Sequence, residues 1–241
     1  MSVEVRFLGS GNAFAAGGRS HACILVTSGD GALLLDCGGS SLPAIVRTID
    51  PQRIDGVAVT HLHGDHFGGI PFLLDEQKWN GRTRPIAIGG PPSLEQRVAQ
   101  VSGGYRMDFS DLRYEVRYLT LGAEEQALGP ARVSAMPVRH SPDSEPHGLR
   151  VRIDGKLIAY SGDAVWGEEL VRLADGADLF ICECTWFERR DPVHLRARDL
   201  EEHRAELRCG RVIITHLGAE SLAERARLPF EAADDGTVLR L

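Results

Sequence analysis

The sequence predicts a layered α/β protein in which the sheets lie inside and the helices outside. Short apolar runs dominate the chain, and each run is bounded by Gly, Pro or Asp, as is typical of strands and short helices. Strand-like segments come first, and strands then alternate with helical patterns, an order typical of layered architectures. Because the 241 residues include no linker rich in Pro or Ser, we expect a single domain over residues 1–241.

The first half of the chain is predicted to hold a hairpin and three helices. Residues 3–8 alternate apolar and polar side chains, which indicates a half-buried strand. Residues 28–31 (SGDG) are a turn signal, so the flanking strands 22–27 and 32–35 should form a hairpin. The other expected strands are 56–60, 85–88 and 114–119, and the expected helices are 42–49, 69–79 and 94–101, the last ended by Gly103 and Gly104. The Gly-rich stretch 89–104 is the one place where a loop insertion is expected.

The second half is predicted to alternate strands and helices. The expected strands are 131–138, 149–153, 156–160, 178–182 and 211–215, and the expected helices are 167–173 and 198–208. Residues 236–241 are expected to close the chain as an edge strand. This alternation places several strand ends, and the residues that follow them, at one edge of a sheet.

Composition excludes several classes of protein. A content of 43% apolar and 25% charged residues is ordinary for a globular chain, and no apolar run approaches the roughly 18 residues that span a bilayer. The acidic residue near the N-terminus argues against a signal peptide, and the five Cys lack CxxC spacing, so a reducing, cytoplasmic setting is expected. The net charge of −7 disfavours a large nucleic-acid interface.

The sharpest signal is a cluster of histidines directly after the predicted strand 56–60. His61, His63, Asp65 and His66 lie within six residues, whereas the whole chain has nine His. Alternate residues of an extended turn point the same way, so His61 and His63 can reach one ion while Asp65 and His66 face a second. Such ligands suit zinc, and manganese or iron is compatible with them. The alternative, a polar loop that is rich in histidine by chance, fits this density poorly.

Three further ionisable residues follow predicted strands. They are His140, Asp163 and His216, after strands 131–138, 156–160 and 211–215. Each one alone has a structural explanation, such as a helix cap for Asp163. Ligand sites collect at the carboxyl ends of strands in layered α/β proteins, so their shared placement favours a common metal site.

Four features of the sequence resemble the metallo-β-lactamase superfamily. They are the HxHxDH run of residues 61–66, the later His140, the Ser-Gly-Asp of residues 161–163 and the Thr-His-Leu of residues 215–217. The resemblance covers nearly the whole chain and implies an αββα four-layer sandwich with two divalent metal ions between the sheets. The residues implied to bind one ion are His61, His63 and His140, those implied to bind the other are Asp65, His66 and His216, and Asp163 would bridge both. Asp36 resembles the aspartate that braces the HxHxDH loop.

Within that superfamily the chain is most similar to the ribonuclease Z-like group. The match extends to the opening residues 8–12, to the Ser-Gly-Asp motif and to residues 183–186 (ECTW). It implies that His194, paired with Glu183, acts as an acid on the leaving group, and that Asp65 orients the water activated by the two metals. The alternative for His194 is a surface histidine before a helix.

One departure from the group bears on the substrate. The bacterial ribonuclease Z pattern carries a long arm that grips tRNA, between the strand that matches residues 148–151 and the Ser-Gly-Asp motif that matches residues 161–163. Here only residues 152–159 separate Val151 from Tyr160, which leaves no room for an arm. We therefore expect a phosphodiesterase that acts on a small, anionic phosphodiester or cyclic phosphate rather than on nucleic acid.

Three alternatives stay open at this point. The chain could be a ribonuclease Z-type tRNA 3′ endonuclease, or a hydrolase of carboxylic ester, lactone or β-lactam bonds, since the same metal site can attack a carbonyl. It could also be a metal-binding module without turnover, although the full ligand set argues against this. A homodimer is a further expectation, because related proteins often form one, and no membrane partner is expected.

Overall fold

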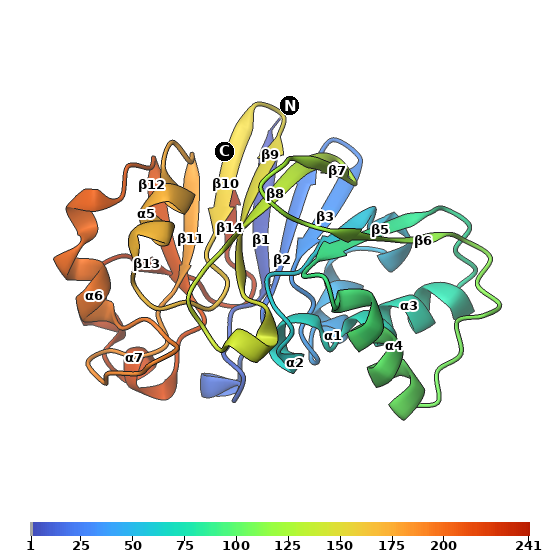
Figure 1. Cartoon of the computed structure of the whole chain (residues 1–241), viewed down its shortest axis with the longest axis horizontal. Helices are drawn as coiled ribbons and strands as arrows, with labels where there is room; N and C mark the ends of the chain where they lie inside the picture. Colours follow the sequence, from blue (N-terminus) through green and yellow to red (C-terminus); the bar gives the residue numbers. More distant parts are fainter. Residues whose placement is uncertain (1) are drawn as a thin grey trace.

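The fold consists of two β-sheets stacked face to face with helices on both outer sides (Figure 1). The structure is a computed structural model that describes residues 2–241. Within these residues each sheet has seven strands, in the orders β14-β1-β2-β3-β4-β5-β6 and β13-β12-β11-β10-β9-β8-β7. This is the αββα sandwich that the sequence resemblance implied.

The first sheet is built mainly from the N-terminal half of the chain. Its strands are β1 (Val3–Gly9), β2 (Cys23–Ser28), β3 (Gly31–Leu35), β4 (Gly56–Ala58), β5 (Ile86–Gly90), β6 (Val116–Thr120) and β14 (Val238–Arg240). Strands β2 and β3 form the predicted hairpin, and β3 to β6 run parallel to one another. Because β14 pairs with β1, the last strand returns beside the first strand at the edge of this sheet.

The second sheet is built from the C-terminal half. Its strands are β7 (Gln126–Leu128), β8 (Ala131–Pro137), β9 (His147–Ile153), β10 (Lys156–Tyr160), β11 (Leu179–Glu183), β12 (Arg211–Thr215) and β13 (Glu231–Ala232). Strands β10 to β13 run parallel. Strands β9 and β10 are joined by the two-residue turn Asp154–Gly155, since Ile153 pairs directly with Lys156.

The helices divide between the two outer faces, as Figure 1 shows. They are α1 (Leu42–Thr48), α2 (Gly64–Phe67), α3 (Ile70–Trp79), α4 (Leu94–Gly104), α5 (Glu168–Ala174), α6 (Ala197–Glu202) and α7 (Ala219–Ala223). Helices α1, α3 and α4 pack on the first sheet, and α5, α6 and α7 pack on the second. None of the helices formed by residues 2–241 is long and apolar enough to cross a membrane.

The main core lies between the two sheets. Side chains of Phe7 and Leu35 from the first sheet meet Val151, Ile158 and Ile181 from the second, and all five are fully buried. Burying such side chains stabilises the fold by about 1.5–3 kcal/mol each. The sheets are thereby held in a fixed relation, so residues at the ends of strands from both sheets can form one site.

Several sequence predictions are corrected by the structure. The stretch 89–104 is not a loop insertion, because it forms the end of β5 and helix α4. That helix does end at the two predicted glycines, with Gly104 as its last residue, although it extends three residues beyond the expected end at 101. The helix expected over 198–208 stops at Glu202 and continues as a single 3₁₀ turn at Arg204–Glu206. The short strands β7 and β13 and helix α7 had no clear periodic signal.

Candidate metal centre

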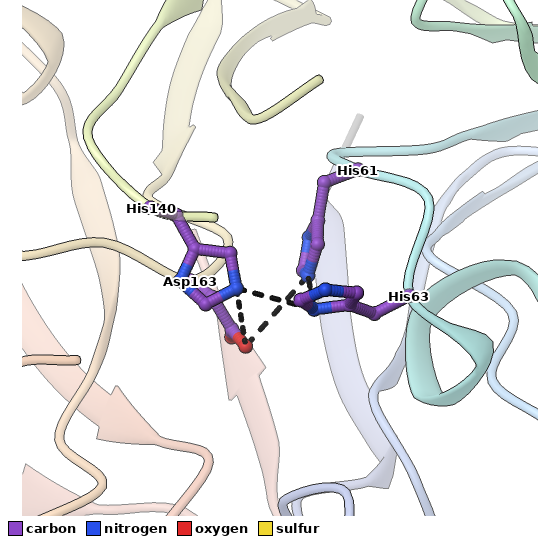
Figure 2. Close-up of side chains that lie close together, drawn as sticks. All are labelled: His61, His63, His140 and Asp163. Atoms are coloured by element: carbon purple, nitrogen blue, oxygen red, sulfur yellow. Dashed lines mark hydrogen bonds and ion pairs between the residues drawn. The ribbon is translucent and has the colours of Figure 1, made fainter. Parts of the chain in front are cut away.

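The first group of predicted site residues converges between the sheets. His61 and His63 come from the turn after β4, His140 from the turn after β8, and Asp163 from the turn after β10 (Figure 2). The Nδ1 atom of His63 lies 3.2 Å from the Nε2 atoms of both His61 and His140. The Oδ2 atom of Asp163 lies 3.7 Å from Nε2 of His61 and 3.9 Å from Nε2 of His140. We call these four residues the first cluster.

A second cluster shares Asp163 and adds Asp65, His66 and His216. The Nε2 atom of His66 lies 3.4 Å from Oδ2 of Asp65 and 3.3 Å from Oδ1 of Asp163. The Nε2 atom of His216 lies 3.3 Å and 3.4 Å from the same two oxygens. Asp163 therefore turns one oxygen toward each cluster, so the seven residues predicted from the sequence are brought together as two adjoining groups.

The backbone is shaped to bring these side chains inward. His216 and Asp36 have φ angles of 59° and 58°, in the left-handed region that non-glycine residues rarely adopt. Such positions cluster at functional sites because the surrounding structure must hold them. Gly162, before Asp163, has a φ angle of 57°, and a Cβ there would lie 2.7 Å from the Cβ of Thr60. The close approach of the two sheets at this point requires glycine.

Buried polar atoms without a partner support the presence of metal ions. Among residues 2–241, Nε2 of His66 and Oδ1 of Asp163 are buried and have no hydrogen-bond partner. Buried polar atoms are nearly always paired, so an unpaired nitrogen and oxygen facing each other need an explanation. Two clusters of imidazole and carboxylate donors fit zinc or a similar divalent ion.

Burial and neighbouring charges set the ionisation of both clusters in the metal-free chain. Burial lowers the pKa of His66, but the charges of Asp163, Asp65 and Asp36 outweigh burial and raise that pKa well above its ordinary value, so this ring must release a proton when a metal binds. Burial lowers the pKa of His61 well below its ordinary value, so its ring is neutral and keeps a lone pair for a metal. Burial alone would raise the pKa of Asp163, but the nearby charges of His216 and His66 lower that pKa well below its ordinary value. The carboxylate shared by the two clusters is therefore ionised, as a metal ligand must be.

Hydrogen bonds from the Nδ1 atoms, on the side of each ring that faces away from the clusters, hold the histidine rings in place. The Nδ1 atom of His66 lies 2.7 Å from Oδ2 of Asp36, and the Nδ1 atom of His140 donates to the carbonyl oxygen of Val193 at 2.6 Å. These bonds leave the Nε2 atoms free to face the clusters, as the outer hydrogen bonds of metal-binding histidines do. Asp36 therefore lies behind the HxHxDH turn, in the place that the sequence resemblance gave it, whereas the Val193 carbonyl carries no sequence signal.

Glu183 and His194 form the pair that the sequence resemblance implied. The Nδ1 atom of His194 lies 2.8 Å from Oε1 of Glu183, and the pair adjoins His216 of the second cluster. Burial of the ring lowers the pKa of His194, but the charge of Glu183 and the hydrogen bond to it outweigh burial and raise that pKa to about 9. The imidazole is therefore protonated at neutral pH and can donate a proton.

Comparison with known proteins agrees with this geometry. Residues 3–230 match the family described as "Anti-Pycsar protein Apyc1". A ribonuclease Z of Methanothermobacter thermautotrophicus is 28% identical, over 96% of this chain and 94% of its own length. Among solved structures, the match to the metallo-β-lactamase fold protein YhfI from Bacillus subtilis covers 100% of both chains, with 22% identity and a TM-score of 0.81. The short form of human tRNase Z (ELAC1) covers 98% of both chains at 25% identity with a TM-score of 0.78.

One family assignment follows from the two sheets, from the residues at their strand ends and from these relatives. The chain belongs to the ribonuclease Z-like branch of the metallo-β-lactamase superfamily and, within it, to the family described as anti-Pycsar protein Apyc1.

Proposed function

We propose that this chain, a hydrolase of the metallo-β-lactamase fold, is a two-metal phosphodiesterase that acts on a small phosphodiester such as a cyclic nucleotide. The observation that carries the proposal is an imidazole hydrogen-bonded to a buried carboxylate, beside two adjoining clusters of metal-ligand side chains. His194 is held by Glu183 at 2.8 Å, and its Nδ1 atom lies 3.8 Å from the Asp163 carboxylate shared by the two clusters. A hydrolase of phosphodiesters needs a proton donor for the leaving alkoxide, and this histidine can serve as one.

In the proposed reaction some residues would bind the metal ions and others would position the water or donate a proton. His61, His63 and His140 would hold one ion, Asp65, His66 and His216 the other, and Asp163 both. Two divalent ions held in this way would supply an activated water at neutral pH and stabilise negative charge on the phosphoryl oxygens. Asp65 would accept a hydrogen bond from the hydroxide, formed when the water gives a proton to solvent, and orient it toward phosphorus, so that its P–O bond forms as the P–O bond to the leaving oxygen breaks. His194 then gives its proton to the leaving oxygen, and Glu183 keeps the imidazole charged until that step.

The shortness of the β9–β10 turn is an argument for a small substrate. In the ribonuclease Z pattern an arm that grips tRNA lies at this place, whereas here Ile153 and Lys156 are joined by two residues. The chain also carries a net charge of −7, and tRNA binding depends on many contacts from cations to phosphates. A small phosphodiester needs only the metal ions and His194.

A second candidate function is cleavage of tRNA precursors at the 3′ end. The similarity to ribonuclease Z over 96% of the chain favours it. Such an activity would have to proceed without the arm, so we expect at most slow cleavage of tRNA precursors compared with turnover of a cyclic nucleotide.

The test is a substrate panel on protein stripped of metal and reloaded with zinc or manganese. The panel contains bis-p-nitrophenyl phosphate, 3′,5′-cyclic nucleotides, a tRNA precursor and a lactone. We expect metal-dependent turnover of the phosphodiesters, complete loss in Asp65→Ala, and a loss of about 10²–10⁴-fold in His194→Ala. His203→Ala is the matched control, because His203 bonds to Glu206 and lies outside both clusters. Turnover of the lactone alone, with His194→Ala fully active, would instead favour an ester hydrolase, and a chain that binds metal without any turnover would refute both.

A further inference from the structure

Thr185 lies between the candidate acid and the second cluster. It follows β11, and only 3% of its surface is exposed. Its Oγ1 atom lies 2.7 Å from Oε2 of Glu183 and 3.0 Å from Nδ1 of His216. A hydroxyl has one proton to donate, and an ionised carboxylate can only accept. Thr185 therefore donates to Glu183 and accepts the Nδ1–H of His216.

This direction of hydrogen bonding fixes the tautomer of His216. With its proton on Nδ1, the ring keeps a lone pair on Nε2, the atom that faces Asp65 and Asp163 at 3.3 and 3.4 Å. The other oxygen of the same carboxylate, Oε1 of Glu183, accepts from His194. One buried carboxylate thus orients two histidines, His194 directly and His216 through the hydroxyl of Thr185.

The first sheet contains the same arrangement. Asp36 contacts His66 directly through Oδ2, and its oxygens lie 3.0 and 3.1 Å from Oγ1 of Thr60. That hydroxyl lies 3.0 Å from Nδ1 of His61, which can donate to it. In both sheets a buried carboxylate at a strand end therefore reaches one histidine directly and a second through a threonine. In the first sheet both histidines belong to the clusters, whereas in the second sheet His194 does not.

From this geometry we infer that Thr185 is a positioning residue that couples the Glu183–His194 pair to metal binding by the second cluster. The inference rests on the two-metal site proposed above. Removing the hydroxyl leaves the buried Nδ1–H of His216 without its acceptor, and the proton can then move to Nε2 and block metal binding. Glu183 keeps its hydrogen bonds from the backbone amides of Ala164 and Thr185, both at 3.0 Å, so the carboxylate stays in place.

The test compares Thr185→Val with Thr185→Ser, because valine keeps the shape and serine keeps the hydroxyl. Thr215→Val is the control, since Thr215 is also a buried threonine at a strand end, but its hydroxyl reaches only the carbonyl oxygen of Ser10, at 3.5 Å. Zinc affinity is measured by competition with a chelator. We expect Thr185→Val to weaken binding of the second zinc ion by about 10–100-fold, the range typical for loss of an outer hydrogen bond to a metal ligand. Serine should restore the affinity, and Thr215→Val should not change it.

Nitrogen NMR of the zinc-loaded wild-type chain gives a second measurement that needs no variant. We expect His216 to bind zinc through Nε2 and to carry a proton on Nδ1. Zinc bound through Nδ1, unchanged second-ion affinity in Thr185→Val, or a serine variant as weak as valine would each overturn the inference. A wild-type chain that binds no second ion would overturn the two-metal proposal as well, whereas two ions bound without phosphodiesterase activity would refute only the proposed reaction.

Discussion

The variant Asp36→Asn tests whether the hydrogen bond between Asp36 and the Nδ1 atom of His66 orients that ring for metal binding. The carboxylate is fully buried, with Oδ1 accepting from the backbone amide of Thr60 at 2.8 Å and Oδ2 facing Nδ1 of His66 at 2.7 Å. Asparagine has one acceptor oxygen and one NH₂ donor. Whichever way the amide turns, its NH₂ group therefore meets a donor.

Each orientation has a cost that can be estimated. If the NH₂ group faces the amide of Thr60, a buried N–H is left without a partner, which destabilises the fold by about 1–3 kcal/mol. If the NH₂ group faces His66, the ring proton moves to Nε2, the atom that faces the second cluster, and zinc affinity falls by about 10–100-fold. Asp36→Asn must therefore lose stability, zinc affinity or both.

The assay combines urea unfolding of the metal-free protein with zinc competition on the folded protein. Asp178→Asn is the matched control, because Asp178 accepts from the backbone amide of Leu157 at 2.8 Å and from Lys156 at 3.1 Å but belongs to neither cluster. The control should lower stability without changing zinc affinity. If Asp36→Asn keeps its unfolding free energy within about 0.5 kcal/mol and also its zinc affinity, the bracing role of Asp36 is wrong.

Three further predictions concern the acid, the core and the approach of the two sheets. In metal-free protein, NMR titration of His194 should give a pKa of about 9, and Glu183→Gln should lower it toward the ordinary value of about 6.5. Because the folded pKa is the higher one, the stability from protonated His194 is fully present below about pH 6.5 and is lost as pH rises through about 9. Phe180→Ala removes a fully buried ring from the outer face of the second sheet and should cost about 3–5 kcal/mol in urea unfolding. Gly162→Ala forces a left-handed backbone on a residue whose Cβ would meet Thr60, so it should cost at least about 1–2 kcal/mol and weaken zinc binding by displacing the next residue.

Much of the fold could be predicted because its strands and most helices carry a clear periodic pattern. The alternation in residues 3–8 and the turn signal at 28–31 correspond to β1 and to the β2–β3 hairpin. Gly103 and Gly104 indicated the end of α4 correctly, because glycine is common where helices stop, although the helix includes both residues. Strands of two or three residues, such as β13 and β7, are too short to show a period at all.

The metal clusters were predictable for a different physical reason. Metal ligands come from a short list of side chains, chiefly His, Cys, Asp and Glu. The turns after β4, β8, β10 and β12 are the places from which such side chains can meet. Thr60 and Thr185 could not be found in this way, because a hydroxyl that orients a histidine acts only through its position in space. Each threonine lies within two residues of a predicted site residue, His61 and Glu183 respectively, yet sequence proximity alone does not reveal a hydrogen bond.

The decisive measurement for the proposed two-metal hydrolysis is the number of metal ions that the chain needs for turnover. The metal-free chain is titrated with zinc while bound metal and hydrolysis of a 3′,5′-cyclic nucleotide are measured in the same samples. We expect no turnover without metal, and activity that appears as the second ion binds, because Asp163 belongs to both clusters. Full activity with one ion per chain, or two ions bound and no hydrolysis of any phosphodiester, would contradict it.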